Sequence, residues 1–323
     1  MVTVERVQLA YNNVYIVEHG SDVVVIDTGP DYRGAREILS VALRGRTPRL
    51  VIATHGHLDH ASLGAWWQSL GVPVMAGRHD LHMTTGEDRT NFEQMERYIR
   101  TIGAPAEVVD EVEEGLKRRR DASRVMRTMN TWAEGGDGRW PTALRYEPFT
   151  PQELIDSPEN VACGLTVLPS PGHTPGNLVV VQPEEGWLFS GDQLLPEITP
   201  TPAIQFEGSK RFQSLPRFLE SLRTLSERWP HLKECFPGHG EPFADPEEEI
   251  RANLGLAEQR SSRVMESLRV LGPGTTYEVA LREYPRALRR RFWPIIATIQ
   301  GQLDVLHEAG EVRCETGRWS VSV

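Results

Sequence analysis

The first half of the chain alternates short β-branched runs with segments of helical periodicity. Residues 22–27 and 50–53 are short, apolar and rich in valine and isoleucine, which is typical of buried strands. Residues 33–43 and 62–70 place apolar side chains three and four positions apart, the spacing of an amphipathic helix. Strands that alternate with helices in this way predict a layered α/β architecture.

The second half returns to strands and ends in helices. Residues 178–181 and 187–190 predict a pair of hairpin strands, and residues 214–229 predict an amphipathic helix. Long helices are then predicted at 247–271 and 294–309, followed by a short hairpin around Thr316-Gly317. Helices followed by a terminal hairpin are the order of a winged-helix module. We therefore predict a main domain at 1–243 and a C-terminal winged-helix-like domain at 244–323.

An insertion at about 87–134 interrupts the α/β pattern of the main domain. It is rich in charged residues, and a stripe that includes Phe92, Met95 and Ile99 predicts two or three helices. Insertions of this length usually cover something. The pattern is compatible with a helical subdomain that has its own small core, with a lid over a substrate pocket, and with the surface of a homodimer.

Composition indicates an ordinary globular chain. Of the 323 residues, 39% are hydrophobic and 25% are charged, so the chain is long enough to bury a core without covalent staples. The net charge of −10 excludes a global basic footprint for nucleic acid. The N-terminus shows no signal peptide, and no apolar run is long enough to span a membrane. We expect a cytoplasmic protein whose cysteines, Cys163, Cys235 and Cys314, are buried or half-buried thiols.

A cluster of potential metal ligands directly follows the predicted strand at 50–53. Its sequence is His55-Gly56-His57-Leu58-Asp59-His60. Imidazole and carboxylate donors together suit zinc, while iron and manganese are further candidates. Three later donors each follow a glycine at the end of a predicted strand: His173, Asp192 and His239. Glycine lets the backbone turn sharply beneath a bound ion.

These seven donors, in this order, resemble the metallo-β-lactamase superfamily over roughly residues 7–243. The resemblance implies an αββα sandwich, here with a helical insertion, and a centre that holds two metal ions. It assigns the first ion to His55, His57 and His173, the second to Asp59, His60 and His239, and a bridging role to Asp192. Asp27, in Asp27-Thr28-Gly29, matches an early motif that supports the metal loop.

The resemblance also implies a mechanism in which a hydroxide that bridges two zinc ions attacks the substrate. Asp59 is a candidate catalytic residue in addition to being a ligand, because its carboxylate could orient that hydroxide or carry a proton. We expect Asp27, Thr54 and Ser190 to hold the imidazoles in place through hydrogen bonds.

Three functions are compatible with this motif. The first is hydrolysis of a small-molecule ester or thioester, as in glyoxalase II, although Gly56 and the predicted C-terminal module depart from that enzyme. The second is cleavage of single-stranded nucleic acid by a metal-dependent ribonuclease or phosphodiesterase. In that case arginines of the C-terminal region would contact phosphates: Arg286, Arg289, Arg290 and Arg291.

The third function is a non-catalytic metal-binding module, against which the complete set of donors argues. A true β-lactamase is not expected, because those enzymes are usually exported and no signal peptide is visible. We rank ester or thioester hydrolysis first.

Overall fold

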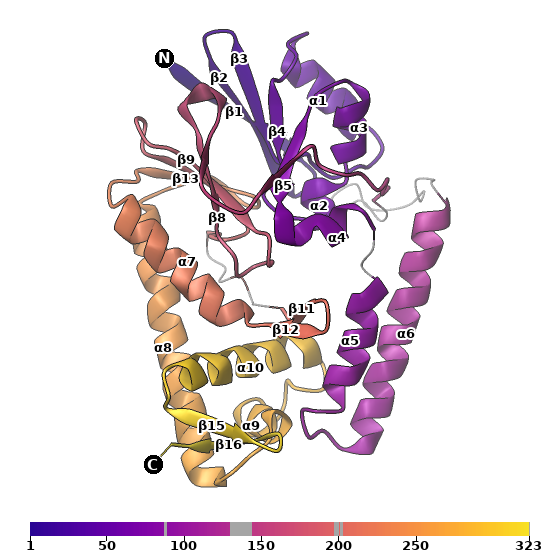
Figure 1. The fold of residues 1–323 in the computed structure, drawn as a ribbon, viewed down its shortest axis with the longest axis vertical. Coiled ribbons are helices and arrows are strands. Elements are labelled where there is room, and N and C mark those ends of the chain that lie inside the picture. Colours follow the sequence, from indigo (N-terminus) through magenta and orange to yellow (C-terminus); the bar gives the residue numbers. More distant parts are fainter. Residues whose placement is uncertain (87–88, 130–143, 197–199, 201–202, 323) are drawn as a thin grey trace.

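The computed structural model describes residues 1–323 apart from 87–88, 130–143, 197–199, 201–202 and 323 (Figure 1). Parts of the insertion predicted at about 87–134, namely 87–88 and 130–134, therefore lie outside the described residues.

Two six-stranded sheets form the centre of the molecule. The first sheet contains, in spatial order, β1 (Val2–Leu9), β2 (Asn12–His19), β3 (Asp22–Ile26), β4 (Leu50–Ile52), β5 (Val74–Gly77) and β6 (Glu153–Ile155). The second contains β14 (Phe243–Ala244), β13 (Glu234–Pro237), β10 (Trp187–Gly191), β9 (Leu178–Gln182), β8 (Thr166–Pro169) and β7 (Glu159–Asn160). Strands β3 to β6 are parallel, and β8, β10 and β13 share one direction in the second sheet. In each sheet, therefore, the carboxyl ends of several strands lie at the same edge.

Alternate residues of a strand serve two different cores, as the period of two requires. In β3, Val24 and Ile26 face the second sheet and share a cluster with Phe189. Their neighbour Val25 points the other way and packs with Leu39 of α1 (Ala35–Leu43).

Helices cover the outer face of each sheet. Helices α1 and α3 (Gly64–Ser69) lie on the first sheet, and α7 (Ser214–Arg228) and the first half of α8 (Pro246–Leu271) lie on the second. The predicted αββα sandwich is thus confirmed.

The remaining elements lie between and beyond these layers. They are α2 (Leu58–Ala61), the 3₁₀ turns η1 (Arg78–Asp80) and η2 (Ala162–Gly164), α4 (Leu81–Thr84), α5 (Arg89–Ile99), α6 (Ala106–Met129), β11 (Gln205–Glu207), β12 (Lys210–Phe212), α9 (Thr276–Glu283), α10 (Phe292–Glu308), β15 (Val312–Glu315) and β16 (Arg318–Val321). Figure 1 shows the sandwich at one end of the molecule and α9, α10 and the β15–β16 hairpin at the other.

The insertion shares its core with the C-terminal helices. Tyr98 and Ile99 of α5 are buried in one cluster with Val279 of α9 and with Ile296 and Leu303 of α10. The expectation that this insertion has its own small core is therefore wrong for α5, because its apolar stripe packs against α9 and α10. The helices and hairpin after residue 245 follow the predicted order, whereas the winged-helix assignment and the domain boundary at 243/244 stay predictions.

The three cysteines are free thiols, and two of them are buried as predicted. Burial raises the pKa of Cys235 to about 12, which makes it a poor nucleophile at neutral pH. The expectation is wrong for Cys314, which is exposed on the terminal hairpin. Among the described helices, none is long and apolar enough to cross a membrane.

Candidate metal centre

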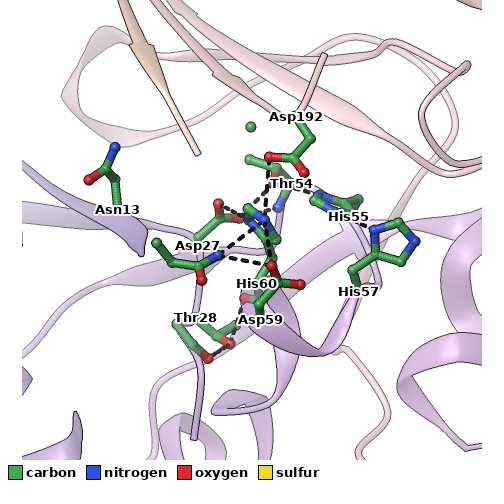
Figure 2. Close-up of polar contacts among 12 residues, drawn as sticks. Asn13, Asp27, Thr28, Thr54, His55, His57, Asp59, His60 and Asp192 are labelled. Atoms are coloured by element: carbon green, nitrogen blue, oxygen red, sulfur yellow. Dashed lines mark hydrogen bonds and ion pairs between the residues drawn. The ribbon is translucent and has the colours of Figure 1, made fainter. Parts of the chain in front are cut away.

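All seven predicted donors lie just beyond the carboxyl ends of strands. The segment His55–His60 follows β4, and His173 follows β8. Asp192 follows β10, and His239 follows β13. Because these strands end at neighbouring edges of the two sheets, residues far apart in the sequence meet at one place (Figure 2).

The first group of donors consists of three imidazoles. His57 Nδ1 lies 3.0 Å from His55 Nε2 and 3.1 Å from His173 Nε2. A tetrahedral zinc ion about 2.0–2.1 Å from each ligand separates its ligand atoms by roughly 3.4 Å. The spacing of this group therefore fits a metal ion.

The second group combines two imidazoles with a carboxylate. His60 Nε2 lies 3.2 Å from His239 Nε2, and Asp59 Oδ2 lies 3.7 Å and 3.5 Å from these two nitrogen atoms. This spacing also fits a single ion, with a mixed nitrogen and oxygen donor set.

Asp192 faces both groups at once. Its Oδ1 lies 3.4 Å from Nε2 of His60 and 3.4 Å from Nε2 of His239, whereas its Oδ2 lies 3.5 Å from Nε2 of His173. One carboxylate that presents a different oxygen to each group is the arrangement expected of a bridging ligand.

Hydrogen bonds fix the tautomers of the second group. A carboxylate or a carbonyl only accepts, so His60 Nδ1–H donates to Asp27 Oδ2 at 2.7 Å, and His239 Nδ1–H donates to the carbonyl of Tyr11 at 3.0 Å. In a ring that binds a metal ion, the only proton is then the one on Nδ1, so Nε2 of His60 and of His239 is free to ligate, and both Nε2 atoms face the other donors. Bare nitrogen atoms turned toward one another are suited to a cation.

Asp27 and Thr54 support the metal loop, as expected. Asp27 Oδ1 accepts hydrogen bonds from the backbone N–H of Thr54 at 2.8 Å and from its hydroxyl at 2.7 Å. The Thr54 oxygen in turn lies 3.2 Å from His55 Nδ1. Asp27 has a φ of 65°, and this sharp turn directs its carboxylate under the loop. The expectation for Ser190 is wrong, because its hydroxyl donates to the carbonyl of Leu194 instead.

Asp80 is a supporting residue that the sequence did not reveal. It is 1% exposed, and its carboxylate accepts from the backbone N–H of Gly56 at 2.9 Å, from the Thr174 hydroxyl at 2.6 Å and from the backbone N–H of Gly176 at 2.7 Å. Asp80 thus joins the loop of His55 and His57 to the loop of His173. The only signal in the sequence was its position a few residues after the apolar segment 72–76.

The turn between β1 and β2 adds two further residues that sequence reasoning missed. Asn12 Nδ2 lies 3.4 Å from Asp59 Oδ2 and 3.2 Å from His60 Nε2. The ring of Tyr11 stacks on the imidazole of His239 with centroids 5.4 Å apart. This turn therefore borders the second group of donors.

The two groups differ in their electrostatics. Burial and the neighbouring imidazole of His57 lower the pKa of His173 to about 3, so this ring is neutral at physiological pH. Burial alone would also lower the pKa of His60, but the carboxylates of Asp192 and Asp27 outweigh it and raise that pKa to about 10. The field at the second group therefore favours a positive charge, which a metal ion supplies.

Gly77 allows β5 to pass directly beneath the His173 loop, and its replacement is expected to be costly. A Cβ at this position would overlap the carbonyl oxygen of Gly176, which is backbone and cannot rotate away. We expect Gly77→Ala to lower the free energy of unfolding by about 3 kcal/mol, as measured by urea denaturation. Gly255→Ala in α8 is the control, because a Cβ there meets open space. Equal stability of the two variants would contradict this packing.

A four-layer sandwich that gathers imidazoles and carboxylates at the strand ends of both sheets is the arrangement of a metal-dependent hydrolase. Comparison with known families agrees: the chain belongs to the metallo-beta-lactamase superfamily, whose family model matches residues 8–239. The seven donors all lie within that match.

Similar proteins support the assignment over most of the chain. A Bacillus subtilis (strain 168) protein described as "Probable metallo-hydrolase YqjP" is 24% identical over 302 residues, which cover 91% of this chain and 86% of the relative. The Drosophila melanogaster "Beta-lactamase-like protein 2 homolog" is 28% identical over 54% of each chain. A crystal structure of a metallo-beta-lactamase family protein from Thermus thermophilus has a TM-score of 0.67 at 24% identity, covering 99% of this chain and 98% of that one. The similarity in fold between the two proteins therefore extends through the C-terminal helices.

Proposed function

We propose that the candidate centre binds two zinc ions. His55, His57 and His173 would hold one ion, Asp59, His60 and His239 would hold the other, and Asp192 would contact both. The observation that carries this proposal is the convergence of all seven donor residues at ligand-like spacing, with the Nε2 atoms of His60 and His239 turned toward the other donors. No other residues of the described chain are needed to complete the set.

Two such ions, when bound, lower the pKa of water toward neutrality and stabilise negative charge on the attacked group. The protein's own residues would orient this chemistry. Asp59 is positioned to act on a proton, because its side chain is 22% exposed and its Oδ2 faces His239. Burial alone would raise the pKa of Asp59, but the imidazoles of His60 and His57 outweigh it and lower that pKa, so the carboxylate is ionised at neutral pH.

For the substrate we propose a small-molecule ester or thioester. The net charge of −10 disfavours a polyanionic substrate. Hydrolysis at an acyl carbonyl would need no groups beyond the metal ligands and Asp59 described above.

A nucleic-acid substrate is the competing proposal, and one observation favours it. Four arginines between α9 and α10 are all solvent-exposed: Arg286, Arg289, Arg290 and Arg291. However, Arg289 forms an ion pair with Glu111 of α6 at 3.4 Å, which reduces its availability for phosphates.

A paired assay distinguishes the two substrates. Purified wild-type protein and His55→Ala are given a panel of acyl thioesters and, separately, single-stranded RNA. We expect thioester hydrolysis by the wild type, lost in His55→Ala, and no RNA cleavage. RNA cleavage that is lost in the same variant, without thioester hydrolysis, would reverse the ranking.

A further inference from the structure

The β11–β12 hairpin joins the metal centre to the C-terminal helices. Figure 1 shows it between the sandwich and α10. Its two strands pair in antiparallel register, with Gln205 opposite Phe212 and Phe206 opposite Arg211. Gln205 and Arg211 therefore lie close together in the hairpin. Gln205 contacts the sandwich, and Arg211 contacts α10.

On the sandwich side, the contact is made to a metal-ligand candidate itself. Gln205 is 7% exposed, and its Nε2–H donates to the backbone carbonyl of His173 at 2.6 Å. Nε2 of the His173 imidazole lies 3.1 Å from Nδ1 of His57. A shift of this carbonyl would therefore turn the ring away from the other donors.

On the helical side, the hairpin is anchored by a buried ion pair. Arg211 donates two hydrogen bonds to Asp304 of α10, at 2.6 Å and 2.7 Å. The Asp304 side chain is 2% exposed and also accepts from Gln300 at 2.9 Å. Two parallel bonds fix the direction of the guanidinium as well as its distance.

Apolar contacts strengthen the same anchor. Ile204 is buried in the cluster of the C-terminal helices, and Phe206 packs against it. The ring of Phe206 meets Tyr98 of α5 with centroids 6.3 Å apart. The hairpin is therefore anchored to the C-terminal helices and to α5 by apolar packing as well as by the ion pair.

The other supports of the His173 loop hold neighbouring residues. Ser221 of α7 donates to the carbonyl of Pro171 at 2.8 Å, and Asp80 holds Thr174 and Gly176. The carbonyl of His173 itself receives its hydrogen bond from Gln205.

We propose that the C-terminal helices set the position of His173 through this hairpin, with Gln205 as the positioning residue. The inference rests on the metal-binding role proposed above for His173. On this inference, the geometry of the metal centre depends on the C-terminal helices.

The test compares two glutamine variants. Gln205→Met keeps the length of the side chain but removes its donor. The matched control is Gln182→Met, because Gln182 is also buried and also donates to a backbone carbonyl, that of Cys163. Zn²⁺ affinity is measured by competition with a chelator. We expect Gln205→Met to bind the ion proposed for His55, His57 and His173 about tenfold more weakly than the wild type. The control should bind both ions as the wild type does.

Hydrogen exchange of the metal-free protein gives a second reading. The amides of residues 170–177 should exchange faster in Gln205→Met than in the control. A milder variant, Arg211→Lys, keeps the charge beside Asp304 but loses the double hydrogen bond, and it should show the same change in that segment. Its control is Arg217→Lys, because Arg217 pairs with Glu308 of α10 from outside the hairpin.

Exchange and zinc affinity that match the controls in both variants would overturn the inference. A wild type that binds no zinc, while the exchange difference persists, would instead contradict the proposed metal function and leave the mechanical coupling standing.

Discussion

Replacing Asp192 with alanine is expected to lower kcat/KM for the proposed ester or thioester substrate at least about a thousandfold. The carboxylate lies within 3.4–3.5 Å of nitrogen donors from both groups, so its loss would remove the bridging position proposed for the two ions. A metal ion contributes several kcal/mol of transition-state stabilisation, and about 4 kcal/mol corresponds to this factor. Steady-state kinetics on the best thioester of the panel measures the effect.

Asp156→Ala is the control for Asp192→Ala. Asp156 is also an aspartate, but it is exposed and pairs with Arg78 on the surface at 2.8 Å. Such pairs contribute little, so we expect near-wild-type rates and stability. A wild-type rate in Asp192→Ala would contradict the bridging role.

Replacing Asp27 with alanine should weaken metal binding about a hundredfold without removing any ligand. Its carboxylate orients His60 and holds Thr54, and such supporting groups are commonly worth 10- to 100-fold in metal affinity. The loss also leaves the backbone N–H of Thr54 buried without its acceptor. We therefore expect the free energy of unfolding of the metal-free protein to fall by about 3 kcal/mol. Chelator competition and urea denaturation measure the two effects.

Asp31→Ala separates the metal effect from the stability effect. Asp31 is a second buried aspartate near the end of the same sheet, and it accepts two hydrogen bonds from Arg36, at 3.1 Å and 2.8 Å. Its loss should reduce stability but leave zinc affinity unchanged. Equal zinc affinity in Asp27→Ala and Asp31→Ala would contradict the role assigned to Asp27.

The sandwich and the seven donors were predictable because each has a local signal. Val23 to Ile26 serve two cores by simple alternation, and the resulting run of buried residues marks a strand. His173, Asp192 and His239 each follow a strand and a glycine, and the ends of parallel strands meet at one edge. The resemblance to a family then supplied the assignment of individual ligands.

The supporting residues were less predictable, because their roles arise from contacts between distant segments. Asp80 joins Gly56 to Gly176, and neither spacing nor composition indicates this pairing. The hairpin of Gln205 and Arg211 consists of two strands of three residues each, which is too short for a clear periodic pattern.

The core that the insertion shares with the C-terminal helices was not predictable from the sequence, for a similar reason. The stripe that contains Ile99 indicated only that one face of the helix is buried. Its partner, α10, lies about two hundred positions further along the chain. Periodicity shows which face is apolar but not which element covers it.

A zinc titration of the metal-free enzyme tests whether hydrolysis depends on two bound ions. The protein is stripped with a chelator, and thioester hydrolysis and bound zinc are measured together as Zn²⁺ is added. We expect no turnover without metal, recovery of activity on titration, and saturation at about two ions per chain. Full turnover by the stripped protein, or a titration in which no zinc binds, would contradict this expectation.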